Sequence, residues 1–159
     1  MSREERRPAS EADDDRVAMT YAERNTWLYA VLVPVTSLAY FGVVVPHLFE
    51  RPAAEVSWTV PMLWAIGATI AGGIVGSIVL AVAARDHRVE SDVRDRQIER
   101  YGDRVAQAIT AFGAAVVLAL AMLEVDHFWI GNALFLIGAV GATWGAVMKI
   151  RAYRGAFHG

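Results

Sequence analysis

Three side chains that could bind a cation lie within one short polar segment between two apolar stretches: Glu124, Asp126 and His127. Carboxylate oxygens and imidazole nitrogens bind divalent metals and protons, so this segment is the first candidate for an ion-binding site. Its spacing matches no known metal-ligand pattern, and Asp126 is better placed to cap the helix that follows. Glu124 would meet the negative end of the preceding helix, which favours a cation beside it: His127, Arg51 or a bound ion.

Catalytic chemistry has little support in the sequence. The chain has no cysteine, so it has no thiol nucleophile, no thiolate metal site and no disulfide. No nucleophile with a neighbouring base and no set of metal ligands falls on one face of a predicted element. We therefore expect neither an enzyme nor a bound metal or cofactor. The net charge of −2 gives no overall field that would attract nucleic acid, so direct nucleic-acid binding is not expected.

Segment 85–104 holds the densest run of charge, with basic and acidic residues interleaved. Ser91 or Asp92 can cap a helix. Four residues lie at spacings that place some of them on one face, which predicts a short helix that runs into the next apolar stretch: Val93, Ile98, Tyr101 and Val105. Gly102 allows a bend just before the membrane. This helix either fixes the topology and touches anionic headgroups, or docks a cytoplasmic protein. The predicted docking residues are Arg94, Asp95, Arg96, Arg100 and Tyr101.

A resemblance supports the docking interpretation. The charged motif over 94–102 reads Arg-Asp-Arg-Gln-Ile-Glu-Arg-Tyr-Gly, and residues 124–130 read Glu-Val-Asp-His-Phe-Trp-Ile. With these motifs, about residues 24–152 of the chain resemble a family of uncharacterised four-span membrane proteins common in actinobacteria. Such proteins look like companions of small helix-turn-helix regulators. The resemblance therefore implies a regulatory docking segment, and it transfers no active residue to this chain.

The elements that position these residues are four apolar blocks, over residues 27–45, 58–84, 105–125 and 128–150. Each is long enough for the ~20 helical residues that cross a bilayer, and helices satisfy their own backbone groups in lipid. Only short segments separate the first block from the second and the third from the fourth, so each pair forms an antiparallel hairpin. The predicted fold is an all-α, integral membrane four-helix bundle of two such hairpins.

The domain organisation follows from the same blocks. We predict a disordered cytoplasmic tail over 1–24, a transmembrane domain over 25–152 and a short cytoplasmic C-terminus over 153–159. No block has a charged residue near its middle, which disfavours proton-coupled transport through the bundle. The alternative to a docking or scaffold subunit is then a small transporter or ion-binding protein that uses the rim of Glu124, Asp126 and His127.

The orientation follows from the basic residues. Fourteen of the fifteen Lys and Arg residues lie in the N-terminal tail, in segment 85–104 or after residue 148, and Arg51 is the exception. In a four-span protein these three regions share one side of the membrane. The positive-inside rule makes that side the cytoplasm, so the sequence predicts a multi-pass protein of the cell membrane with both termini inside.

Small residues at spacing four predict where the helices touch, because helix contacts in lipid depend on close packing. Gly72 and Gly76 mark such a face in the second block, and Gly141 and Gly145 mark one in the fourth. The third block has a row of three alanines, Ala111, Ala115 and Ala119. These faces serve packing within one chain or a homo-oligomer. Two amides, Gln107 and Asn132, are predicted to form hydrogen bonds between helices.

Overall fold

The computed structural model describes residues 21–83 and 93–156, with the side chains of all of them except 93–95 and 156. The described residues form four long helices and no strand: α2 (Tyr21–His47), α3 (Thr59–Ala83), α4 (Val93–Met122) and α5 (His127–Arg151). Two short helical turns, η1 (Ala53–Glu55) and η2 (Ala152–Ala156), follow α2 and α5. All four long helices are long and apolar enough to cross a membrane, so the predicted all-α, four-helix fold is confirmed.

Helices α2, α4 and α5 start earlier than their apolar blocks do, whereas α3 starts at Thr59, one residue after its block begins. Helix α2 begins at Tyr21, within the segment predicted to be a disordered tail, and residues 1–20 of that tail lie outside the described residues. Glu23 in the first turn of α2 suits the positive end of the helix dipole, and the Thr26 hydroxyl donates to the Ala22 carbonyl at 2.9 Å. Helix α4 begins at Val93 and runs through Gly102 as one element, so the charged segment and the third span are one helix.

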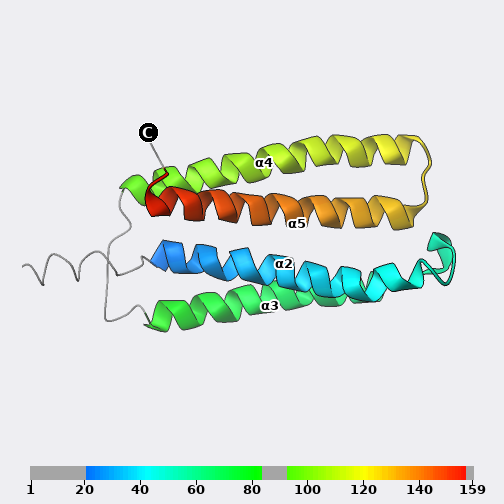
Figure 1. The fold of residues 1–159 in the computed structure, drawn as a ribbon, viewed down its shortest axis with the longest axis horizontal. Helices are drawn as coiled ribbons and strands as arrows, with labels where there is room; N and C mark the ends of the chain where they lie inside the picture. Colours follow the sequence, from blue (N-terminus) through cyan, green and yellow to red (C-terminus); the bar gives the residue numbers. More distant parts are fainter. Residues whose placement is uncertain (1–20, 84–92, 157–159) are drawn as a thin grey trace, which may run out of the picture.

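The helices pack in the order α4, α5, α2, α3, as Figure 1 shows. The predicted hairpin partners are neighbours, and α2 and α5 bring the two hairpins together. Among the described residues, α3 and α4 make no extensive contact, so the four helices form a row with α3 and α4 outermost. Helices α2 and α4 begin and α3 and α5 end at one end of this row, the termini end, and both hairpins turn at the other, the hairpin end.

Large side chains fill the contact between the two hairpins at the hairpin end. Tyr40 and Val44 of α2 are buried there with Val56, Ala65 and Phe128. The Tyr40 hydroxyl donates to the Asn132 Oδ1 atom at 2.6 Å, and the Asn132 amide donates to the Phe128 carbonyl at 2.8 Å. The prediction that Asn132 bonds between helices is confirmed. Gln107 instead lies exposed on α4.

Several glycines face the partner helix of the same hairpin and allow the two helices to approach closely. A Cβ atom on Gly72 would lie 3.1 Å from the Leu32 side chain of α2, and one on Gly76 would lie 2.5 Å from Leu28. On α5, a Cβ atom on Gly141 would lie 2.9 Å from the Thr110 hydroxyl of α4. Each of these contacts joins the two helices of one hairpin.

The alanine row of α4 is not a contact face within the chain. Ala111, Ala115 and Ala119 are all exposed, so of the two predicted roles the packing face within one chain is wrong, and the homo-oligomer face stays a prediction. Helix α4 instead turns Gly113 toward α5, where it lies against the Ile137 side chain. The reason is that lipid is as apolar as a helix contact, so a regular row of small residues does not by itself identify the packed face.

Candidate functional site

A polar groove opens at the termini end, where α2 and α4 flank α5. Its volume is about 380 Å³. Small residues of α4 and α5 form its floor, including Gly102, Ala106, Ala142 and Gly145. Its polar lining consists of Asn25, Thr26, Tyr29, Glu99, Asp103 and Lys149. This groove is concave and has several polar side chains in its lining, which makes it the first candidate for a binding site.

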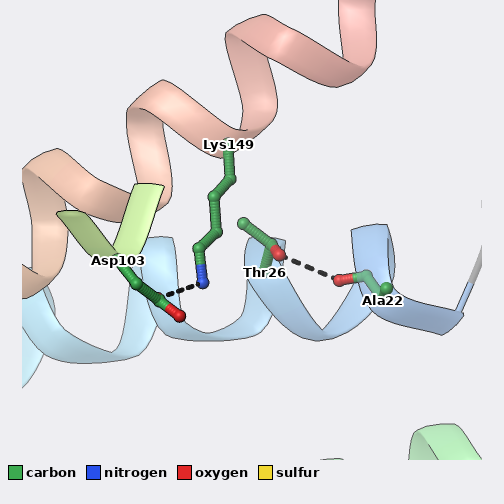
Figure 2. Close-up of polar contacts among 4 residues, drawn as sticks. All are labelled: Ala22, Thr26, Asp103 and Lys149. Atoms are coloured by element: carbon green, nitrogen blue, oxygen red, sulfur yellow. Dashed lines mark hydrogen bonds and ion pairs between the residues drawn. The ribbon is translucent and has the colours of Figure 1, made fainter. Parts of the chain in front are cut away.

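An ion pair crosses one end of this groove. The Lys149 Nζ atom of α5 lies 2.8 Å from the Asp103 Oδ1 atom of α4, as Figure 2 shows with Thr26 of α2 nearby. The Lys149 side chain is 19% exposed, whereas Asp103 is 58% exposed. Gly102 makes this position possible, because a Cβ atom there would collide with the Lys149 stem. The only lysine of the sequence is thus held across the contact between α4 and α5.

The first turns of α4 form a helix that is anchored on one side and exposed on the other. Ile98 is 0% exposed and Gly102 is buried. The predicted docking residues Arg96, Arg100 and Tyr101 are exposed. The other two, Arg94 and Asp95, lie in α4, but their side chains fall outside the described ones. The structure therefore brings Arg96 and Arg100 onto an accessible surface, one helical turn apart.

The hairpin-end residues have structural roles in the turn between α4 and α5. Glu124 has a φ of 53°, in the left-handed region that favours glycine. Its backbone N–H donates to the Ala121 carbonyl at 3.1 Å, and that of Val125 donates to the Leu120 carbonyl at 3.1 Å. These two bonds form a Schellman motif, with a glutamate where glycine is usual. Helix α4 is therefore ended by the backbone conformation of Glu124.

Asp126 caps α5, as predicted: its Oδ1 atom accepts a hydrogen bond from the Phe128 N–H at 2.8 Å. His127 begins that helix and is exposed. Within residues 21–83 and 93–156, no three His, Asp or Glu side chains are placed together to hold a metal ion. The local geometry thus explains both residues: Glu124 lies in the motif that ends α4, and Asp126 caps the start of α5.

The sequence-based predictions did not include two contacts of basic side chains at the termini end. One is the Lys149–Asp103 ion pair, and the other is the Arg154 guanidinium, whose Cζ atom lies 5.1 Å from the centre of the Trp27 ring. The Lys149–Asp103 ion pair could have been predicted from the sequence. In a tight antiparallel hairpin, residues at equal distances from the turn face each other, and Asp103 and Lys149 lie at equal distances along the sequence from Asp126. The Arg154–Trp27 contact joins α2 to the region after α5, and no hairpin register predicts it.

Comparison with known proteins gives no relative: no family model, no curated protein and no solved structure matches the chain.

Proposed function

We propose that this chain is a non-enzymatic, multi-pass membrane protein with both termini in the cytoplasm, and that the start of α4 docks an acidic surface of a soluble cytoplasmic protein. The observation that carries the proposal is the anchored helix at the termini end. Ile98 is fully buried while Arg96 and Arg100 are exposed, so the arginines are presented on a fixed element. A regulatory or scaffold subunit needs such a surface.

The exposed arginines form one basic row, Arg96, Arg100 and Arg104. Residues four apart on an α-helix differ by about 40° in direction, so the three guanidinium groups share one side of α4. The centre of this row lies roughly 170° around the helix from Ile98 and Gly102. The row therefore faces away from the rest of the bundle and is accessible to a partner.

The length of the row favours a protein partner over lipid headgroups. Arg104 directly precedes the apolar stretch that starts at Val105, and Arg96 lies about 12 Å further along the helix axis. Arg104 is therefore at the depth of the headgroups, whereas Arg96 extends beyond them. Guanidinium groups bind carboxylates through paired hydrogen bonds, so the complementary surface is acidic.

The side of the membrane can be tested with single cysteines, because the chain has none of its own. Arg100→Cys and Glu55→Cys place one thiol at each end of the row of helices, both at exposed positions. In intact cells a membrane-impermeant maleimide should label the Glu55→Cys variant alone. The Arg100→Cys variant should react only after permeabilisation. Labelling of Arg100→Cys in intact cells would reverse the proposed orientation.

Docking can be tested by photo-crosslinking from Gln97, an exposed neutral position beside the basic row. A crosslinking amino acid there should capture an acidic soluble protein, and adding Arg100→Glu should reduce that product about tenfold, because like charges would then oppose each other. Arg51→Glu is the matched control, since Arg51 is an exposed arginine at the hairpin end. It should leave the product unchanged.

Two results would contradict the docking proposal. One is a crosslinked product that survives Arg100→Glu at its full amount, which would show that the basic row does not hold the partner. The other is a product formed with lipid alone, which would assign the row to anionic headgroups. Binding through the row should also weaken as salt is raised, because its charges are exposed.

A further inference from the structure

The groove at the termini end changes in polarity along its length. Glu99, Asp103 and Lys149 line the part near the helix ends. Val33, Ala106 and Ala142 line the part nearer the middle of the helices. Ala142 lies seven residues before Lys149 on α5, which is about 10 Å along the helix axis. In a membrane, the polar part would lie at the headgroups and the apolar part among the upper acyl chains.

The groove is open because of how the row of helices is built. Helices α2 and α4 both pack on α5 but make no extensive contact with each other among the described residues. The floor between them carries only small side chains, since α4 and α5 approach closely at Gly102 and Gly145. Apart from Lys149 at the polar end, the α5 residues that line the space are small: Ala142, Gly145 and Ala146. The groove therefore has the shape to hold a chain-like molecule lying along α5.

The charges of the groove favour a headgroup with both signs. Lys149 contributes one positive charge, and Glu99 and Asp103 contribute one negative charge each, so the net charge is negative. A purely anionic headgroup would meet two carboxylates. A headgroup with a phosphate and an ammonium has a partner for each charge. Lys149 has three N–H donors, so it can bind a phosphate while it stays paired with Asp103. The Glu99 carboxylate can accept hydrogen bonds from the ammonium.

We propose that this groove binds a zwitterionic phospholipid with a primary ammonium headgroup, the phosphatidylethanolamine class. Its phosphate lies at Lys149, its ammonium lies at Glu99, and one acyl chain follows Val33 and Ala142. The proposal depends on membrane insertion of the four helices and not on the protein docked at the basic row. The lipid proposal depends on Glu99, whereas the docking proposal depends on Arg96 and Arg100. An experiment can therefore contradict one proposal without contradicting the other.

The test is native mass spectrometry of the full chain with equal amounts of phosphatidylethanolamine and phosphatidylglycerol that have identical acyl chains. The parent chain should retain the ethanolamine lipid about fivefold more than the glycerol lipid, as expected for one partly exposed charged contact. Glu99→Gln should remove this preference. Adding Asp103→Asn makes the net charge of the groove positive, so the double variant should prefer the anionic glycerol lipid.

Glu55→Gln is the matched control, because it makes the same chemical change at an exposed site of the hairpin end. It should keep the parental preference. Equal retention of the two lipids by the parent chain would overturn the proposal, and so would a loss of preference in Glu55→Gln as large as that in Glu99→Gln. Circular dichroism of each variant verifies that helix content is unchanged. No change is expected, because Glu99 and Asp103 are exposed and an amide side chain has the same shape as the carboxylate that it replaces.

Discussion

Replacing Gly145 with leucine is expected to lower the free energy of unfolding by about 3 kcal/mol, the upper part of the range for overpacked contacts. A Cβ atom at this position would lie 2.9 Å from the Ala106 Cβ atom and 2.9 Å from the Gly102 carbonyl oxygen. The second of these is a backbone atom, which cannot turn away as a flexible side chain could. The larger residue therefore forces α4 and α5 apart along their contact, and membrane helices depend on such close approach.

Gly138 provides the control for this experiment on the same helix. Nothing lies within 4 Å of a Cβ atom at Gly138, which is exposed. Gly138→Leu should change the free energy of unfolding by no more than about 0.5 kcal/mol, as surface substitutions usually do. Both variants can be measured by titrating the folded protein in mild detergent with a denaturing detergent. Equal losses in the two variants would show that the α4–α5 crossing does not limit stability.

Replacing Ile98 with alanine is expected to cost about 2–4 kcal/mol, the usual cost of removing a buried isoleucine side chain down to its Cβ atom. Ile98 is 0% exposed, although the residues on either side of it are exposed. A short helix that extends from a bundle is marginal without packing, because its own backbone bonds barely offset the entropy of ordering it. The loss should therefore appear mainly at the start of α4.

Hydrogen exchange measures this effect locally. Backbone amides over 96–104 should exchange faster in Ile98→Ala, while those in the middle of α5 should keep their protection. Ile74→Ala is the matched control, because Ile74 is 56% exposed on α3. The Ile98 variant should also give less crosslinked product from Gln97, since a frayed helix no longer presents the arginines. Unchanged exchange at 96–104 would mean that Ile98 does not anchor this segment.

The hairpins were predictable from the sequence because connection length determines which helices are neighbours. The turn between α4 and α5 is short, so these helices must be antiparallel partners, and Asp126 has the residue type and position of a helix cap. The buried amide of Asn132 was also predictable, since a side-chain amide in an apolar helix needs a partner. These predictions rest on local chemistry that does not depend on how the hairpins pair.

The pairing of the hairpins was not predictable, because the apolar helices carry little information about which side is packed. In a soluble protein the apolar face is the buried face, but lipid removes that contrast. Ala111 and Gly113 are both small, yet only Gly113 is buried. The groove of Lys149 and Asp103 forms where α2 and α4 flank α5, so it could not be predicted before the order of the helices was known.

The row of four helices has a consequence for the lipids around it. With helices about 10 Å wide, a row has a perimeter of about 90 Å, whereas a square arrangement has about 70 Å. In a membrane, the chain would therefore contact more annular lipids than a square bundle of the same mass, and the inner helices α2 and α5 would be open to lipid on both sides of the row. Its conformation should respond to bilayer thickness and lateral pressure more strongly than that of a closed bundle.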